Sequence, residues 1–251
     1  TANYTVGPAF QLVSFSNATG VAFSSWTPTC NNVTRTMSAD LNGDGYDDVI
    51  NYAPANRLLC IHFVNSTTGA SFEPQVNVTH SAAIKGLDFA DFTGNGRADM
   101  VSIQNNGVVS IDAFSNRTNT FSNEDSLTLY VTGTQTPATL SHMLLDHFNG
   151  TSNPPILIAV DSSNDGTEVF WASGSVVAST STIAGISSDA VVGDFDGDGD
   201  LDIVASRSTG HRSIEKRMNG WSGDNHNNVI DLTNATILDY DLDMDAHILI
   251  P

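Results

Sequence analysis

The stretch VVGDFDGDGDLDIVAS, residues 191–206, places aspartates at alternate positions from Asp194 to Asp202, between two apolar runs. Glycine fills two of the gaps between these aspartates. Carboxylates two residues apart in a tight loop point inward together, and glycine lets the backbone curl around a hard cation that takes six to eight oxygen ligands. The pattern therefore predicts a calcium-binding loop that joins two β-strands.

Imperfect copies of this loop recur along the chain. SADLNGDGYDDVIN from Ser38 and FADFTGNGRADMVS from Phe89 share its frame, whereas LLDHFNGTSNPPILIA from Leu144 lacks the inner acids. A last copy, ILDYDLDMDAHILI from Ile237, has histidine in place of the closing acid. The aspartates that open the first to fifth loops are Asp40, Asp91, Asp146, Asp194 and Asp239. Their spacing of about 45 to 55 residues is close to the length of a four-stranded propeller blade.

The segments between the loops read as strands. Each loop precedes a short apolar strand, then a polar turn, a strand such as VVSIDAFS, another turn and a polar-alternating strand, and no stretch has convincing helical periodicity. The fifth repeat is two strands short, but FQLVSFSNATG and VAFSSWTP near the N-terminus resemble the missing pair. We therefore expect one all-β domain over residues 1–251, a five-bladed β-propeller whose last blade is closed by the N-terminal strands.

The loop pattern D-x-[DN]-x-[DN]-G-x-x-D between apolar strands, with FxLVSFSNATG as a later hairpin, resembles the FG-GAP repeats of integrin alpha-chain propellers and integrin-like fungal lectins. The resemblance covers essentially the whole chain and implies a propeller fold. It leaves the function open, because propellers with such repeats include adhesion receptors, lectins and parts of polysaccharide-cleaving enzymes. The third and fifth loops depart from the pattern, and seven repeats are usual in that group.

Three loops carry a full set of oxygen ligands, four from side chains and one from a main-chain carbonyl. The predicted ligands are Asp40, Asn42, Asp44, Asp48 and the Tyr46 carbonyl in the first loop; Asp91, Thr93, Asn95, Asp99 and the Arg97 carbonyl in the second; and Asp194, Asp196, Asp198, Asp202 and the Asp200 carbonyl in the fourth. An EF-hand would need a glutamate at the twelfth position, where Asn51 and Ala205 stand. We expect about three structural calcium ions; the alternative is that these loops are solvated acidic turns.

The remaining two loops are weaker candidates for metal binding. The third loop lacks the acids and is expected to be empty. The fifth loop is ambiguous, since Asp239, Asp241 and Asp243 are in place but His247 offers nitrogen, which suits zinc better than calcium. The alternative role for His247 is that of a hydrogen-bonded turn residue.

Composition limits the class of protein. The 251 residues are 40% hydrophobic, enough for one large core, and no apolar run approaches the ~18 residues of a membrane span. With 28 acidic residues against 9 basic ones, the formal charge of -19 argues against nucleic acid as a partner. The chain begins with threonine, and we expect a mature form from which any targeting segment has been removed.

Sequons and cysteines favour an extracellular setting. Cys30 and Cys60 are the only cysteines and predict one disulfide, the alternative being two buried thiols. Eight asparagines stand in glycosylation sequons: Asn3, Asn17, Asn32, Asn65, Asn77, Asn116, Asn149 and Asn234. We therefore expect a secreted glycoprotein.

The expected fold separates two faces. In a four-stranded meander the metal loops share a face with the turn between the third and fourth strands, where Asn17, Asn65 and Asn116 fall. Sugar on these residues would crowd the metal face, so we expect a ligand on the opposite face. Arg207, His211 and Arg212 are the candidate ligand-binding residues there, with solubilising turn charges as the alternative.

Two functional classes follow. The first is a secreted propeller that binds carbohydrate or acts in adhesion, with a glycan or glycoprotein as partner. The alternative is a lyase or glycosidase acting on an acidic glycan, in which Arg207 and Arg212 bind a carboxylate and His211 or Tyr240 moves a proton. No Ser-His-Asp motif, metalloprotease helix or phosphate-binding loop is visible in the sequence, so no catalytic residue is predicted. Trp26, Trp171 and Trp221 could stack on sugar rings, but packing between blades is their commoner role.

Overall fold

The structure is a computed structural model of the chain. It describes residues 10–16, 20–26, 30–65, 67, 71–80, 83–116, 118–131, 134, 136–148, 154–188, 190–195, 201–207, 210–217, 220–226, 236–238 and 247–249. For residues 10–26 within these ranges, for residue 181 and from residue 206 onward, only the backbone is described.

Four antiparallel four-stranded meanders make up most of the described chain. The first sheet contains β3 (Arg35–Ala39), β4 (Asp48–Ala53), β5 (Leu58–His62) and β6 (Val76–Thr79). The second contains β7 (Gly86–Ala90), β8 (Asp99–Ile103), β9 (Val108–Ser115) and β10 (Thr120–Thr128). The third contains β11 (Leu140–Asp146), β12 (Ile156–Asp161), β13 (Asp165–Ala172) and β14 (Ser175–Ala184). The fourth contains β15 (Val191–Gly193), β16 (Asp202–Arg207), β17 (Gly210–Arg217) and β18 (Gly220–His226).

The described residues include no α-helix, and their only helical element is the short 3-10 turn η1 (Pro54–Asn56). No helix of the described chain is long and apolar enough to cross a membrane. The all-β expectation is therefore confirmed.

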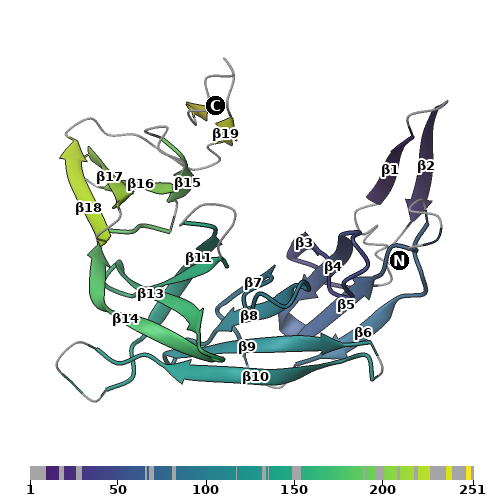
Figure 1. The fold of residues 1–251 in the computed structure, drawn as a ribbon, viewed down its shortest axis with the longest axis horizontal. Coiled ribbons are helices and arrows are strands. Elements are labelled where there is room, and N and C mark those ends of the chain that lie inside the picture. The colour runs from purple at the N-terminus through teal and green to yellow at the C-terminus, as the bar shows by residue number, and fades with distance from the viewer. Residues whose placement is uncertain are drawn as a thin grey trace, which may run out of the picture.

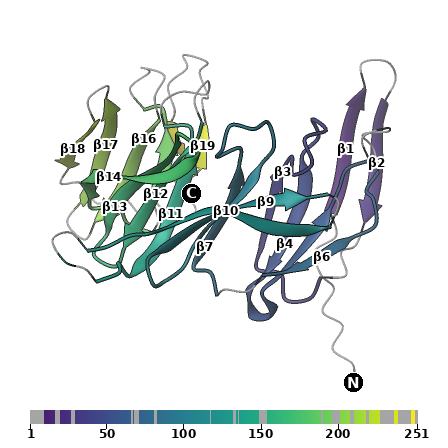
Figure 2. The same ribbon diagram turned by 60° about the horizontal axis from the view of Figure 1, so that its bottom comes forward.

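Burial falls from the inner strands to the outer strand of the second sheet. Every residue of β8 is buried, β9 alternates between buried and partly buried positions, and β10 is mostly exposed. A strand that is apolar on both faces must be covered on both faces. The sheets provide this cover for one another, since they stand side by side in chain order (Figures 1 and 2).

The hydrophobic core is divided among the interfaces between consecutive sheets. Ile50 and Ile61 of the first sheet pack in one cluster with Met100 of the second. Val101 and Ile111 of the second sheet pack with Leu157 of the third, and Ile158 of the third packs with Ile203 of the fourth. Alternate residues of one strand thus face different neighbours, as face-to-face stacking of blades requires.

The predicted disulfide is confirmed. Cys30, which follows the N-terminal hairpin, is bonded to Cys60 of β5 with a Cα–Cα distance of 6.1 Å. Both cysteines are buried and pack with Ala53, Val33 and Leu58 in a small separate cluster. The bond ties the N-terminal segment to the first sheet.

The two ends of the chain form separate hairpins. β1 (Phe10–Ser16) pairs with β2 (Gly20–Trp26), so the expected N-terminal strand pair is confirmed. β19 (Thr236–Leu238) pairs with β20 (His247–Leu249) in another two-stranded sheet. Among the described strands no ladder joins the two hairpins, which lie apart in Figure 1. The composite blade that we expected is therefore not formed in this structure, and closure of the ring stays a prediction.

Candidate metal loops and inter-sheet cavities

The first loop, residues 40–48, wraps around the carboxylate of its opening aspartate. Asp40 Oδ1 accepts hydrogen bonds from the backbone N–H groups of Gly43 (2.7 Å) and Asp44 (3.2 Å), and Oδ2 accepts one from Gly45 (2.8 Å). Gly43 and Gly45 have φ values of 77° and 85°, a left-handed conformation that glycine adopts without steric cost. The glycines of the motif are thus needed to turn the backbone N–H groups inward.

The second loop, residues 91–99, repeats this construction. Asp91 Oδ1 accepts the Asn95 N–H (2.8 Å) and Oδ2 accepts the Gly96 N–H (2.8 Å), while Gly94 and Gly96 have φ values of 71° and 85°. Within each loop the middle ligand candidates also bond to each other. Asn42 Nδ2 donates to Asp44 Oδ2 (3.0 Å), and Asn95 Nδ2 donates to Thr93 Oγ1 (2.8 Å).

The closing aspartates of three loops lie in the protein interior. Asp48, Asp99 and Asp202 are 0%, 1% and 2% exposed. Asp48 accepts the N–H groups of Leu41 (3.2 Å) and Val64 (3.0 Å), and Asp202 accepts the Phe195 N–H (3.2 Å). These aspartates therefore fix the start of their loops to the second strand of the sheet.

Burial also shifts the proton affinity of these groups. Desolvation raises the pKa of Asp48 to about 7, the carboxylates of Asp44 and Asp40 add to this rise, and the two backbone hydrogen bonds oppose it. Burial likewise raises the pKa of Asp99. A buried carboxylate among other carboxylates is an electrostatic arrangement that a cation would relieve.

The chemistry of the first two loops fits a hard cation. All candidate ligands carry oxygen, which suits calcium or magnesium rather than zinc or copper. Tyr46 is 42% exposed, and its N–H bonds to Asp44 Oδ1 (3.0 Å); the Arg97 N–H bonds to Asn95 Oδ1 in the same way (3.0 Å). Among the residues that the structure describes, no three His, Cys, Asp or Glu side chains converge on one point as a metal-ligand group. The calcium ligand set stays a prediction.

The other loops are only partly visible. Asp194 and Asp202 bound the fourth loop, but Asp196, Asp198 and Asp200 lie outside the described residues, as do Asp239, Asp241 and Asp243 of the fifth. In the third loop Asp146 accepts the N–H of the next residue, His147 (2.8 Å), and Pro154 and Pro155 lead into β12.

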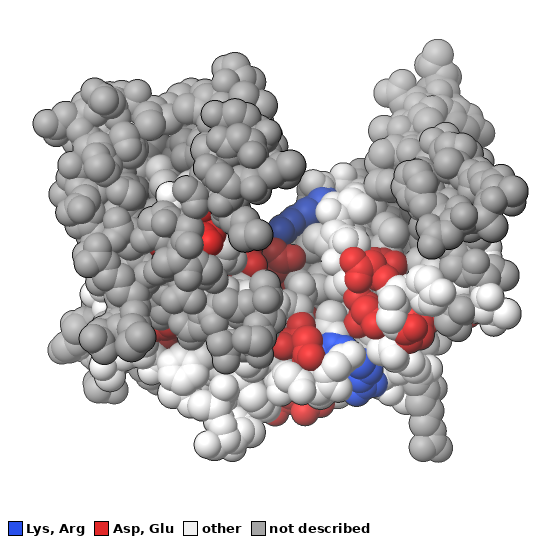
Figure 3. Space-filling view, turned by 45° about the horizontal axis from the view of Figure 1, so that its top comes forward, with Lys and Arg blue, Asp and Glu red and all other residues white. Residues whose placement is uncertain are grey.

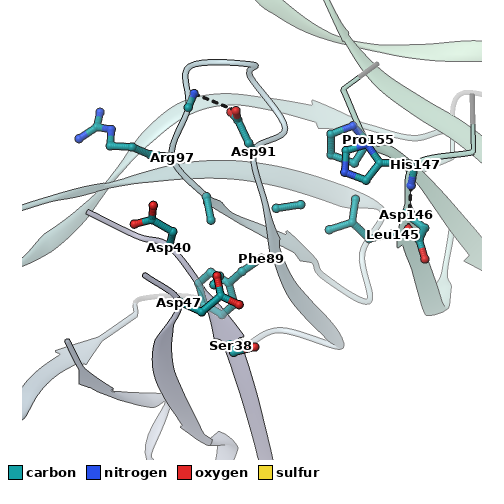
Figure 4. A pocket seen from close by; sticks show the side chains of 14 residues that line it. Ser38, Asp40, Asp47, Phe89, Asp91, Arg97, Leu145, Asp146, His147 and Pro155 are labelled. Atoms are coloured by element: carbon teal, nitrogen blue, oxygen red, sulfur yellow. Dashed lines mark hydrogen bonds between the residues drawn. The ribbon is translucent and has the colours of Figure 1, made fainter. Parts of the chain in front are cut away.

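A cavity of about 440 Å³ lies where the first three loops approach one another. Its lining includes the opening aspartates Asp40, Asp91 and Asp146, with Asp47, Arg97 and His147 (Figure 4). Acidic side chains also gather on the hollowed face shown in Figure 3. We call it the loop-face cavity, and it lies on the inner side of the predicted metal face.

A second cavity, of about 460 Å³, lies between the first and second sheets. Asn123 Nδ2, beside a bulge in β10, donates to Ser110 Oγ (2.8 Å) and to Asp112 Oδ1 (3.1 Å), and the Ser110 hydroxyl donates to Asp112 Oδ2 (2.9 Å). His80 lines the same cavity and stacks on Tyr52 with ring centroids 6.4 Å apart. Burial lowers the pKa of His80, although Asp112 opposes the shift.

A third cavity, of about 330 Å³, lies at the second inter-sheet position, between the third sheet and the segment that connects β10 to β11. Tyr130, which is 54% exposed, stands at it together with Asp161, Asp165 and Thr167. Asp161 Oδ1 accepts the N–H groups of Ser163 (2.8 Å) and Asp165 (3.0 Å). An exposed aromatic ring beside carboxylate and hydroxyl groups can hold a polar ring-shaped ligand.

The two inter-sheet cavities occupy equivalent positions. Ser102 and Ser110 are cross-strand partners at the first of them, and Ala159 and Thr167 are cross-strand partners at the second. Both lie toward the turns opposite the metal loops. In the first sheet the corresponding cross-strand pair is Asn51 and Cys60. The disulfide between Cys60 and Cys30 therefore lies where the other two sheets border a cavity. The sequence did not lead us to predict the residues that line these cavities. The polar residues Ser110 and Asp112 within the otherwise apolar VVSIDAFS were the available signal for the first of them.

The predicted ligand residues can be placed by backbone alone. His211 and Arg212 pair with Ser206 and Ala205, and Arg207 pairs with Gly210 at the β16–β17 turn. Arg217 pairs with Gly220 at the far end of β17. This turn lies at the same end of its sheet as the turns that border the inter-sheet cavities. The side chains of the three residues lie outside the described part, and their binding role is untested.

The sequons and tryptophans are also only partly described. Asn32, Asn77 and Asn116 are exposed and Asn65 is partly buried, whereas Asn3, Asn17, Asn149 and Asn234 lie outside the described residues. Trp171 packs against the core between the second and third sheets, in agreement with a packing role. Trp26 and Trp221 are described by backbone only.

Comparison with known proteins supports the repeat and the fold. Residues 40–102 match the family model of the FG-GAP-like repeat. No curated protein sequence matches the chain. A protein from Lactobacillus plantarum is similar in structure, with 9% identity and a TM-score of 0.53 over 88% of this chain and 65% of its own. A lectin from Agrocybe aegerita, described for specific recognition of non-reducing terminal N-acetylglucosamine, has 14% identity and a TM-score of 0.59 over 91% of this chain and 66% of its own.

The chain thus spans slightly less than two thirds of each of these structures. At such low identity the likeness concerns the fold alone. The resemblance to FG-GAP repeats is confirmed for residues 40–102, and the fold is all-β and propeller-like.

Proposed function

We propose that this chain, in which residues 40–102 are FG-GAP-like repeats, is a secreted, calcium-stabilised β-propeller that binds carbohydrate or acts in adhesion. The observation that carries the proposal is the recurrence of a polar cavity at equivalent positions of two consecutive sheet interfaces. Several cavities of the same kind suit a ligand that is built from repeated units, such as a glycan.

The chemistry of the two cavities suits sugar hydroxyl groups. Their volumes of about 460 and 330 Å³ lie within the ~300 to 1,000 Å³ range of small-molecule sites. Asn123 Nδ2 bonds within the protein and orients its amide, so the Asn123 carbonyl oxygen and the Asp112 carboxylate offer acceptors at one cavity, and Tyr130 offers a ring face at the other. The similar lectin from Agrocybe aegerita recognises a terminal saccharide unit, which supports the same class of ligand here.

The turn with Arg207, His211 and Arg212 stays part of the proposal as an alternative ligand site. A guanidinium holds a carboxylate or vicinal hydroxyls through two parallel hydrogen bonds. The turn and the cavities share one face, so both placements put the ligand opposite the metal loops.

Calcium is proposed as a structural ion in the first, second and fourth loops. Support comes from the oxygen-only donor sets and from the buried Asp48, whose carboxylate faces those of Asp40 and Asp44. A bound cation would supply positive charge to these groups and hold the loop closed, while the chain's own N–H groups orient the carboxylates.

We further propose that the ring has five blades and that the terminal hairpins join to complete it. An isolated two-stranded hairpin is marginally stable, and β1–β2 and β19–β20 each have open edges. Their pairing would remove these edges. Secretion is supported by the disulfide, which persists in oxidising compartments.

The test is a glycan array probed with the unsubstituted protein and with matched variants. Asn123→Ala and Tyr130→Ala should each weaken binding by ~1 to 3 kcal/mol, because each removes contacts from one cavity. Arg212→Ala would weaken binding only if the β16–β17 turn is the site, and Arg217→Ala serves as the control at the far end of the strand. An ultraviolet assay on uronate polymers runs alongside. Unsaturated product there, with no array binding, would favour the lyase alternative and overturn the lectin proposal.

A further inference from the structure

The first two loops touch each other directly. The Ala98 N–H of the second loop donates to the main-chain carbonyl of Asp40 in the first (2.8 Å). The side chain of Arg97 lies against Gly43, so closely that a Cβ at Gly43 would stand 2.7 Å from Arg97 Cγ and 3.0 Å from Cδ. Figure 4 shows Arg97 and Asp40 at the rim of the loop-face cavity. The second loop therefore braces the first by one hydrogen bond and one packed side chain.

The third loop does not brace the second in the same way. Ala98 directly precedes β8 and Pro155 directly precedes β12, and both line the loop-face cavity, so the two residues are equivalent. Proline has no N–H, and Pro155 therefore cannot donate to the carbonyl of Asp91. Pro154, in the place of Arg97, lies near Gly94, but a Cβ there would be 3.9 Å from Pro154 Cγ. In the described part of the third loop, the backbone hydrogen bond and the close packing that link the first two loops therefore have no equivalent.

We infer that the first and second loops are an energetically coupled pair of cation sites, with Arg97 as the positioning residue between them. The inference rests on the calcium part of the proposed function. Arg97 belongs to the second loop, where its carbonyl is a predicted ligand, and its side chain supports the first. A cation that orders the second loop fixes Arg97 and Ala98, so the first loop loses less conformational freedom when it binds its own cation.

Packing and charge make opposite predictions for Arg97. As a positive charge near the first loop, the guanidinium repels a cation, so its removal would strengthen binding there. As a brace over Gly43, the hydrocarbon stem orders the loop, so its removal weakens binding. Arg97→Ala removes both charge and stem, whereas Arg97→Met removes the charge and keeps an unbranched stem. The two variants together separate the two effects.

The experiment is a terbium titration of the metal-free full-length chain, read by tyrosine-sensitised emission. Tyr46 lies in the first loop and is 42% exposed, whereas residues 91–99 contain no tyrosine or tryptophan. The first-loop signal is the emission that is present in the unsubstituted chain and absent in Tyr46→Phe. Emission that remains in Tyr46→Phe, such as that from Tyr240 in the fifth loop, is subtracted. Circular dichroism of each variant checks that it is folded.

We expect Asp91→Asn, which impairs only the second loop, to raise the first-loop midpoint by about fivefold or more. Arg97→Ala should raise it by a similar factor, whereas Arg97→Met, which keeps an unbranched stem and removes the repelling charge, should lower it. Lys85→Met removes a positive charge at the opposite end of β7 and should change nothing. Combining Asp91→Asn with Arg97→Ala should add little, because both interrupt the same connection.

The inference is overturned if Asp91→Asn leaves the first-loop midpoint unchanged, or if Arg97→Ala lowers it. Independent, multiplicative effects of the two changes would also overturn it. A different failure is recognisable: no Tyr46-dependent emission and no calcium effect on melting in the unsubstituted chain would refute the calcium proposal itself.

Discussion

At the residue scale, the two kinds of loop aspartate have different physical roles. Asp40 and Asp91 lie at the loop surface and gather backbone N–H groups, whereas Asp48 and Asp99 are buried and anchor the loop to the next strand. The opening aspartate is therefore a ligand candidate that shapes the loop, and the closing aspartate is a ligand candidate that also anchors the loop. Loss of a buried anchor should be costly even without metal, because it leaves the N–H groups of Leu41 and Val64 unpaired.

His62 gives the residue-scale prediction. It is 1% exposed, packs edge-on against Phe72 at 6.3 Å, and has its pKa lowered by burial to about 4. Because the unfolded chain binds this proton from about pH 6.5, stability is fully present above that pH and falls as pH drops toward 4. The loss due to His62 between pH 7 and pH 5 should be about 2 kcal/mol.

The measurement is the free energy of unfolding in denaturant at both pH values, for the unsubstituted chain and for His62→Phe. The comparison is needed because the raised pKa of Asp48 acts in the opposite direction over the same range. Equal pH dependence in the two proteins would show that His62 does not titrate as its burial implies.

At the element scale, the disulfide of the first sheet lies at the strand position that borders a cavity in the second and third sheets. The strand pair Asn51 and Cys60 corresponds to the pairs that border the inter-sheet cavities, so the first interface is closed covalently where the next two are open. The sequence could predict the bond from the cysteine count and the strands from apolar periodicity. It could not predict the cavities, because these depend on how the faces of two sheets meet, which periodicity within one strand does not specify.

Removal of the disulfide should destabilise the chain measurably. The bond closes a loop with a sequence separation of 30, which corresponds to about 3 to 4 kcal/mol of unfolded-state entropy. Cys30→Ala combined with Cys60→Ala should lower the free energy of unfolding by at least this amount, since both side chains are also buried. The unsubstituted chain under reductant serves as the control. A double variant as stable as the oxidised chain would contradict the prediction.

At the scale of the whole molecule, the sequence predicted the repeated sheets but not their closure. The meander strands, the N-terminal hairpin and the repeat match all agree with the periodic pattern. Closure depends on pairing between the two ends of the chain, which no local pattern encodes, and β1–β2 and β19–β20 form separate sheets here. The difference between Ala98 and Pro155 is visible in the sequence, but it gains meaning only when the loops are placed side by side.

Calcium removal tests the molecule as a unit. Asp48 and Asp99 are buried and are the first residues of β4 and β8. A cation bound in either loop would therefore stabilise these strands as well as the loop itself. Binding only to the folded state adds about 2.7 kcal/mol per site at a hundredfold excess over Kd. For a chain of this size one such site should raise the melting temperature by roughly 5 to 10 °C.

Calorimetry with calcium against excess chelator measures the shift, and magnesium at equal concentration tests selectivity. Identical melting temperatures, in a sample shown by elemental analysis to be metal-free, would mean that the aspartate loops support the fold without a cation.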